Sequence, residues 1–297
     1  MNTLAFAFRS LAKSPVFSLV AIFALALGIG ANSAIFSVIE TIFLRPLPYA
    51  DADRIVQLQS LLPDRGLAQA PISWPRLLAL RERQEVFTDV SVSTPNAFIV
   101  TGTGDPEQLQ GLIVSQNYFP LLGVQPMLGR NFLADEDKPG GAPVVLLSYG
   151  YWQKHFAGRA DVVGQPLTLD GTPYSVVGVL PKDANGFPLN QIAIFTTRPY
   201  ESPFLTQKQI DDGGLFYNVL GRLKPGVGIA QVRAAMDVIA SGYAQAHPTN
   251  VDAKSKLDAN FLQENLVGNQ RDTYTMLFVA VASVLLIARA NVANLLL

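Results

Sequence analysis

The sequence predicts an α+β membrane protein in which two transmembrane helices flank one large mixed α/β domain. Two nearly uncharged apolar runs, Val16 to Phe43 and Met276 to Leu297, predict the helices. Alternating strand and helix patterns between these runs predict the domain. Composition agrees, because only 15% of the residues are charged, against about 25% in soluble domains, and the mean hydropathy is +0.26.

The first apolar run is long enough to cross a bilayer. Glu40 is its only charged residue. As a helix the run would extend about 42 Å, beyond the roughly 30 Å hydrocarbon core of a membrane. We therefore expect a transmembrane helix over residues 16–44, preceded by a cytoplasmic segment over 1–15.

The stretch LALGIGANSAIF within this run allows two interpretations. In a dinucleotide-binding G-x-G-x-x-G turn, Gly28 and Gly30 would be the first two glycines, but Ser33 replaces the third. The alternative is a helix-packing face, since small residues let membrane helices approach closely. Small residues recur at spacings of four, four and three: Ala26, Gly30, Ala34 and Ser37. We interpret these four as helix-packing residues, although small residues are common in membrane helices in any case.

The second apolar run is interrupted by one charge, Arg289, and continues to the last residue. We expect a second transmembrane helix over 273–297 that is cut short, so that the chain is a piece of a longer protein. Arg9 and Lys13 precede the first span without any acidic residue, which places the N-terminus in the cytoplasm and the large domain outside. A cleaved signal peptide is the rival interpretation, but the first run is too long for one.

The segment from 45 to 272 alternates strand and helix patterns. Strands are predicted in RIVQLQS from Arg54, at 98–101, 108–114 and 144–148, and in QIAIFTT, FYNVLGRL and KLDANFL. Ser73 is a candidate N-cap for a short helix, and another is expected around Trp152. A longer amphipathic helix from Ile229 to Tyr243 should end before Pro248.

One hairpin stands out in the middle of this segment. Asp170-Gly171 lies between two apolar-rich runs, and this residue pair favours a two-residue hairpin turn. A strand and a helix, a turn-rich insert, and then another strand and helix indicate one α/β unit split by a second. The predicted insert covers 122–214 and the split halves cover 45–121 and 215–272.

A search for chemistry in the same segment finds little. His155 and His247 have no metal-ligand partner at suitable spacing, and cysteine is absent. The acidic run Asp135–Asp137 does not alternate as calcium ligands do, so we expect a solvated turn. We therefore predict no catalytic residue, no bound cofactor and no metal site, hence no enzyme. A net charge of −1 also argues against nucleic acid as a partner.

Several segments carry a family resemblance: SPVFSLVAIFALALGIGANSAIFSVIETIFLRPLPYADADRIV, VSQNYFPLLGVQPMLGRNFLADED, VVLLSYGYWQKHF, VVGQPLTLDGTPYSVVGVLP, LGRLKPGVGIAQVRAAM and VLLIARANVANLLL. Together they resemble MacB-like ABC-transporter permeases of the wider FtsX-like group, and the middle four resemble the MacB-like periplasmic core domain. The chain departs from the pattern at Arg289, where a small residue is expected.

The resemblance implies a porter-like subdomain split by a smaller α/β insert, in a multi-pass protein of the bacterial inner membrane. It also implies a permease subunit of an ABC-type export or mechanotransmission complex, working with a separate ATP-binding subunit. Further partners would be a second permease in a homodimer or pair, a periplasmic adaptor, and membrane lipid. Two alternatives stay open: a membrane-anchored extracytoplasmic binding module without transport activity, and a membrane-tethered hydrolase.

Overall fold

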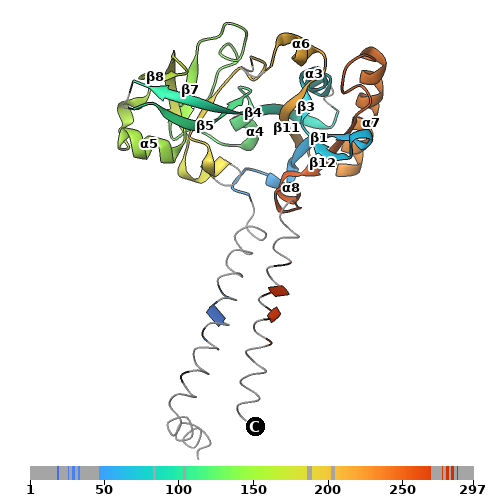
Figure 1. Cartoon of the computed structure of the whole chain (residues 1–297), viewed down its shortest axis with the longest axis horizontal. Coiled ribbons are helices and arrows are strands. Elements are labelled where there is room, and N and C mark those ends of the chain that lie inside the picture. The colour runs from blue at the N-terminus through green and yellow to red at the C-terminus, as the bar shows by residue number, and fades with distance from the viewer. Residues whose placement is uncertain are drawn as a thin grey trace, which may run out of the picture. The chain divides into compact units, whose positions relative to one another are not determined.

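The computed structural model describes residues 47–82, 85–102, 105–185, 189–201 and 205–268, together with isolated positions of the flanking segments. Contacts divide the chain into two units. One is Leu47–Asn265, and the other combines Met1–Pro46 with Leu266–Leu297. Figure 1 labels the helices and strands of Leu47–Asn265, which carries the α/β fold.

The predicted segments 1–15, 16–44 and 273–297 fall wholly or largely outside the described residues. Within the described part of the chain, no helix is both long enough and apolar enough to cross a membrane. The two spans therefore remain predictions.

The first part of the domain alternates strands with short helices (Figure 1). Its elements are η2 Ala52–Arg54, β1 Ile55–Leu62, η3 Pro63–Arg65, β2 Leu67–Ala70, β3 Ile72–Ser73, α3 Trp74–Glu82, β4 Phe87–Thr101, β5 Glu107–Val114 and α4 Tyr118–Leu122. The predicted strand in RIVQLQS is confirmed as β1. The predicted strand at 98–101 is only the end of the much longer β4.

The middle and last parts continue the alternation. The middle elements are β6 Leu128–Gly129, β7 Val144–Leu147, α5 Tyr149–Phe156, η4 Ala160–Val162, β8 Pro166–Leu169, β9 Thr172–Val179, η5 Lys182–Asn185, η6 Leu189–Gln191 and β10 Ile194–Thr196. The last are α6 Gln207–Asp211, β11 Leu215–Leu223, α7 Ile229–Ala246, β12 Lys256–Phe261 and α8 Leu262–Gly268. The helix around Trp152 and the last predicted strands are confirmed.

The described strands form a 12-stranded sheet with the main order β12-β1-β11-β4-β5-β10-β7-β9-β6. β2 pairs with β1, β3 with β11, and β8 with both β4 and β9. The β5–β10 and β7–β9 pairs are parallel, and the other pairs along this path are antiparallel. One sheet thus runs continuously through both parts of the predicted split domain, whose boundaries at 122 and 214 remain a prediction.

Local sequence explains the best-predicted elements. The Ser73 hydroxyl accepts a hydrogen bond from the Arg76 amide at 3.4 Å, so Ser73 begins α3 as expected. α7 ends at His247, whose amide donates to the Tyr243 carbonyl at 2.8 Å, and Pro248 prevents its continuation. Asp170 and Gly171 have φ values of 49° and 79°, as a tight hairpin turn requires, and they join the paired strands β8 and β9.

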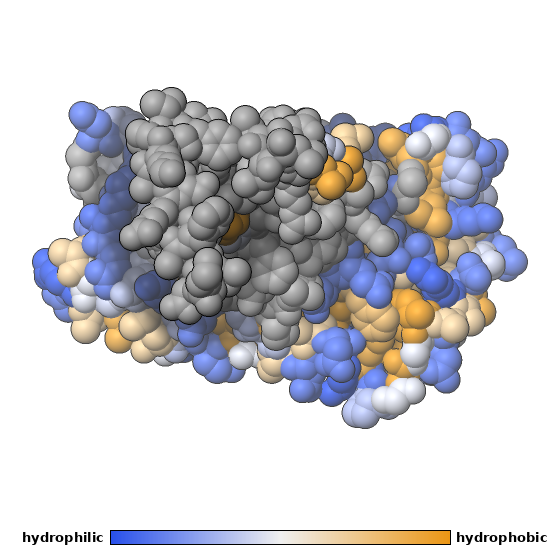
Figure 2. All heavy atoms as spheres, turned by 90° about the horizontal axis from the view of Figure 1, so that it is seen from below, coloured by the Kyte–Doolittle hydropathy of each residue, from blue (hydrophilic) through white to orange (hydrophobic). Residues whose placement is uncertain are grey.

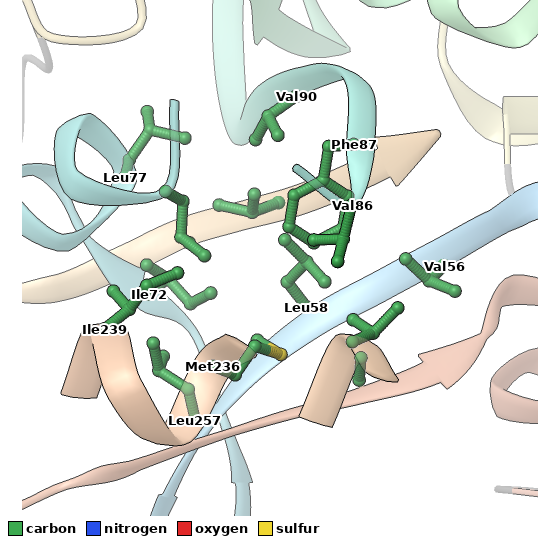
Figure 3. Packing of buried hydrophobic residues seen from close by; sticks show 14 of the residues in the cluster. Val56, Leu58, Ile72, Leu77, Val86, Phe87, Val90, Met236, Ile239 and Leu257 are labelled. Carbon is green, nitrogen blue, oxygen red and sulfur yellow. The ribbon is translucent and has the colours of Figure 1, made fainter. Parts of the chain in front are cut away.

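Two hydrophobic clusters account for much of the interior of the described domain. The first core contains Val56, Leu58, Ile72, Leu77, Leu80, Val86, Phe87, Val90, Val92, Tyr217, Val219, Leu223, Val232, Met236, Ile239, Leu257 and Ala259. The second core contains Phe98, Val100, Leu109, Ile113, Val145, Leu147, Tyr151, Trp152, Val162, Leu167, Leu169, Val176, Val179 and Ile194. In the first core, Met236 and Ile239 of α7 point toward the strands that carry Leu58 and Leu257 (Figure 3).

The outer surface is mixed in character. On the face shown in Figure 2, hydrophilic and hydrophobic side chains lie side by side over the visible described residues. Such mixing is normal, because apolar atoms supply more than half of the accessible surface of most folded proteins. The visible described surface on this face therefore does not by itself mark a site, and the polar features near the junction of the two cores are more informative.

Candidate functional site at the junction of the two cores

The strand β4 joins the two cores. Its Val90 and Val92 belong to the first core, and its Phe98 and Val100 belong to the second. A 15-residue strand is long compared with the usual five or six residues. Because one continuous strand carries side chains of both cores, a movement of one core relative to the other would involve this strand.

The pairing partners of β4 change at one residue. β11 pairs with β4 from Phe87 up to Ser93, which lies opposite Asn218. β5 pairs with β4 from Ser93, opposite Val114, to Val100. Ser93 is thus the single β4 residue that pairs with both β11 and β5. Two residues further along β4 lies Pro95, which has no backbone N–H to donate to a neighbouring strand. We call Ser93 the pivot of the sheet.

A polar clasp braces the chain beside this pivot. The Asn117 side-chain amide donates to Asp89 Oδ1 at 2.6 Å and to the Val90 carbonyl at 3.1 Å. The Ser115 hydroxyl donates to Asn117 Oδ1 at 2.6 Å and accepts from the Val92 amide at 3.0 Å. This clasp of Asp89, Ser115 and Asn117 holds the chain after β5 against the first half of β4.

Asp137 ties the acidic turn to the same region. Its Oδ1 accepts from the Thr197 hydroxyl at 2.6 Å and from the Arg198 amide at 2.9 Å. Its Oδ2 accepts from the Gln116 amide at 3.1 Å, and its carbonyl accepts from the Tyr200 hydroxyl at 3.0 Å. One carboxylate therefore joins the chain that follows β5 to the chain that follows β10.

The expectation of a solvated turn at Asp135–Asp137 was wrong for two of its three residues. Asp135 is exposed, and its hydrogen bond with Lys138 lowers the pKa of that carboxyl. Glu136 is buried. Its carboxylate accepts hydrogen bonds from both terminal nitrogens of Arg130, at 3.0 and 2.6 Å, and from the Leu133 amide at 2.7 Å, and these bonds compensate its burial. Composition alone did not show that these carboxylates have internal donors.

Arg222 connects three separate segments. Its Nε and Nη2 donate to the Leu121 carbonyl of α4 at 2.8 and 2.6 Å, and Nη2 also donates to the Ala50 carbonyl at 2.7 Å. Burial lowers the pKa of this guanidinium, and the nearby Asp51 carboxylate opposes that effect. Arg222 thereby links β11 and α4 to the segment that precedes β1.

A cleft of about 280 Å³ opens beside the clasp. Arg81, Asp89, Asn117 and Asp137 are among its lining residues. Arg81 Nε donates to the Val90 carbonyl at 3.3 Å, and the guanidinium lies 6.0 Å from the centre of the Trp74 ring. Burial lowers the pKa of Arg81, while the carboxylates of Asp137 and Asp89 act in the opposite direction. Neither Arg81 nor Asp89 is among the residues that the sequence pattern predicted for a site.

A buried ion pair fixes the helices of the first core. Arg76 Nε lies 3.0 Å from Asp252 Oδ2, and both side chains are fully buried. The hydroxyls of Ser73 and Tyr243 also donate to the Asp252 carboxylate, at 2.5 and 3.0 Å. The Arg76 guanidinium lies 4.5 Å from the centre of the Tyr243 ring. The pair joins α3 to the loop between α7 and β12, which indicates a structural role.

The histidines do not come together. His155 lies 3.5 Å from Glu107 and stacks on Tyr151, whereas His247 ends α7. In the described part of the chain, no group of three or more potential metal ligands is present.

The small-residue stripe is only partly covered by the structure. Ala26 and Gly30 are helical and exposed, and a Cβ at Gly30 would meet nothing within 4 Å. Ala34 and Ser37 lie outside the described residues. The helix-packing role of these four residues therefore stays a prediction.

Comparison with curated proteins finds partial matches. The pyoverdine export ATP-binding/permease protein PvdT of Pseudomonas syringae pv. tomato is 30% identical over 152 residues, which are 50% of this chain and 22% of that protein. The same protein of Pseudomonas syringae pv. syringae is 29% identical over an equal length. The chain thus matches less than a quarter of the length of these relatives.

Comparison with solved structures shows the fold. The periplasmic region of MacB from Actinobacillus actinomycetemcomitans has a TM-score of 0.50 at 13% identity, covering 75% of this chain and 94% of that one. The extracellular domain of the noncanonic ABC-type transporter YknZ from Gram-positive bacteria has a TM-score of 0.50 at 15% identity, covering 69% and 99%. A family model, the MacB-like periplasmic core domain, matches residues 18–239. Since that match covers most of the chain, the protein belongs to the family of the MacB-like periplasmic core domain.

Proposed function

We propose that the chain is part of a permease subunit of an ABC-type export or mechanotransmission complex. In this role its domain lies outside the inner membrane and changes shape when a separate cytoplasmic subunit hydrolyses ATP. Membership of the MacB-like family and the partial match to export ATP-binding/permease proteins support the proposal. The role is not enzymatic, and it needs no cofactor of its own.

The observation that carries the proposal is the change of pairing at Ser93. β4 carries side chains of both cores, and Ser93 is its one residue that pairs with both β11 and β5. A rotation of the cores about Ser93 would therefore break few backbone hydrogen bonds of the sheet and would act mainly on the side-chain contacts of the clasp, Asp137 and Arg222. Sliding two packed cores across a broad shared face would instead break many contacts, because protein interiors are closely packed. The pivot is therefore suited to passing a movement from one core to the other.

Arg222 connects the pivot region to the segment before β1, from which such a movement would come. Its contacts to Ala50 and Leu121 join the segment before β1 to α4, and α4 packs on β4. A displacement of the segment before β1 would thus act on β11 through Arg222, and through α4 on β4, the strand with side chains in both cores. The expected partners are an ATP-binding subunit, a second permease copy, a periplasmic adaptor and membrane lipid.

Distance measurements between the two cores test the proposal. The chain has no cysteine of its own, so spin labels can be placed at exposed Asp237 of α7 and exposed Gln153 of α5. In the full-length permease with its partner ATPase, the distance between these labels should differ between the ATP-bound and nucleotide-free states. A control pair at Asp237 and Leu78, on α7 and α3 of the first core, should keep one distance. Identical distances for the first pair in both states would contradict the proposal.

A further inference from the structure

The cleft beside the clasp is lined from both sides of the pivot. Arg81 comes from α3, and Thr88 and Asp89 come from the first half of β4. Gln116 and Asp137 come from the chain after β5 and from the acidic turn. A molecule bound in this cleft would therefore contact two segments whose relative position depends on the pivot.

The positive charge in the cleft is incompletely paired. Arg81 donates one hydrogen bond, from Nε to the Val90 carbonyl, and within the described residues its terminal nitrogens have no hydrogen-bond partner. The carboxylates of Asp137 and Asp89 act to raise the pKa of Arg81, but neither forms an ion pair with it in this part of the chain. A guanidinium with free terminal N–H groups can donate two parallel hydrogen bonds to one carboxylate, in a bidentate contact.

The two carboxylates of the cleft differ in the number of hydrogen bonds that they accept. Asp137 accepts three hydrogen bonds from protein groups, shared between its two oxygens. Asp89 accepts two, from Asn117 and from the Val90 amide, and both go to Oδ1. Asp89 Oδ2 is therefore the acceptor that remains for an incoming donor among the described groups.

We propose that this cleft binds a small zwitterion of the α-amino acid type. Its carboxylate would contact the terminal nitrogens of Arg81, and its ammonium group would donate to Asp89 Oδ2. A volume of about 280 Å³ is close to the lower end of ligand pockets, which suits a small molecule. Both contacts come from the first-core side of the pivot, and the bound molecule would fill the cleft up to Gln116 and Asp137 on the other side. This inference rests on the proposed function, because a molecule that fills this space would restrict the approach of the two sides.

Ligand-observed NMR titration of the full chain in detergent micelles tests the inference. The probes are glycine and L-alanine, with propionate and ethylamine as analogues that carry only one of the two charges. We expect the amino acids to bind at least tenfold more tightly than either analogue. Arg81→Gln should weaken glycine binding at least tenfold, and Arg81→Lys should restore part of it. Arg65→Gln, at an exposed arginine of η3 outside the cleft, is the matched control and should bind as the unchanged chain does.

Two results would overturn the inference. One is the absence of glycine and alanine binding to the unchanged chain, and the other is equal binding to Arg81→Gln with its thermal unfolding midpoint preserved. The spin-label distances separate this inference from the proposed function. If the two cores move with ATP but no amino acid binds, only the inference fails. If amino acids bind as described but the cores never move, the proposed function fails and the cleft remains a binding site.

Discussion

Ser93 and Asn218 form the last residue pair between β4 and β11, and β5 pairs with β4 from that same serine onward. The sheet is continuous at this point, but Ser93 is the one residue of β4 that pairs with both β11 and β5. A continuous sheet would normally resist bending across its strands, because each strand is held by both neighbours over several residues. With so short an overlap of the backbone pairing, the side-chain hydrogen bonds around Ser93 contribute more to holding the two parts of the sheet together. We therefore expect mutation of these side chains to lower the stability of the domain.

Asp137 is expected to stabilise the junction by its charge. In Asp137→Asn the side chain loses acceptor capacity for the Thr197 hydroxyl and the Arg198 and Gln116 amides. We expect the free energy of unfolding to fall by about 2–3 kcal/mol, since hydrogen bonds to charged groups are the stronger ones. Asp135→Asn is the control, because Asp135 is exposed, and its urea unfolding curve should overlay that of the unchanged chain.

The buried pair of Arg76 and Asp252 should show strong coupling. Arg76→Met leaves the Asp252 carboxylate buried without its cation, at an expected cost of about 3–5 kcal/mol. Arg76→Met combined with Asp252→Leu should recover a large part of that loss. The exposed pair of Lys208 and Asp212 serves as comparison, where Lys208→Met should cost about 1 kcal/mol or less. Additive losses for Arg76 and Asp252 in urea unfolding would show that the two charges do not depend on each other.

The buried phenol of Tyr217 should lower the stability of the folded domain at alkaline pH. Burial raises the pKa of its phenol to about 12, and its hydroxyl is buried without a hydrogen-bond partner within the described residues. A phenol in the unfolded chain ionises near pH 10. The folded state binds this proton more tightly, so its contribution is complete below about pH 10 and is lost as the pH rises toward 12.

Tyr217→Phe should therefore change stability in two ways. At pH 7 it removes a buried hydroxyl without a partner, so the free energy of unfolding should stay equal or rise by about 1 kcal/mol or less. Between pH 10 and 12 the variant should lose stability less steeply than the unchanged chain. Denaturant unfolding at pH 7, 10 and 11.5 measures both effects. A large loss of stability at pH 7 would mean that the hydroxyl has a partner after all.

The hairpin between β8 and β9 depends on backbone conformation. Gly171 has a φ of 79°, a region that side chains with a Cβ avoid. Gly171→Ala should cost about 1 kcal/mol, although an added Cβ would meet nothing within 4 Å. Gly150→Ala is the matched control, because Gly150 lies in α5 with equally open surroundings, and there alanine should be neutral or stabilising by about 0.5 kcal/mol. Thermal unfolding of the two variants compares them directly.

Local patterns predicted α7, the β8–β9 hairpin and most strand positions, because apolar spacing, caps and turn residues act over a few neighbours. The first part of β4 escaped prediction since serines and a threonine occupy buried positions there: Ser91, Ser93 and Thr94. The pivot and the clasp could not be predicted either. Both depend on which strands pair, and that is decided by contacts between residues far apart in the sequence, such as Asp89 and Asn117.

The clasp should control movement at the pivot. Cysteines at Asp89 and Asn117, whose side chains are already in contact, would join the two sides of the junction when oxidised. In liposomes that contain the full-length permease and its partner ATPase, we expect oxidation to lower ATP turnover severalfold and a reducing agent to restore it. A cysteine pair at Leu61 and Lys256, which lie opposite each other in β1 and β12, should form a disulfide without changing turnover, because both belong to strands on the same side of the pivot. Equal turnover of the oxidised and reduced clasp would mean that the ATPase works without rotation about Ser93, and the domain would then act as a rigid body.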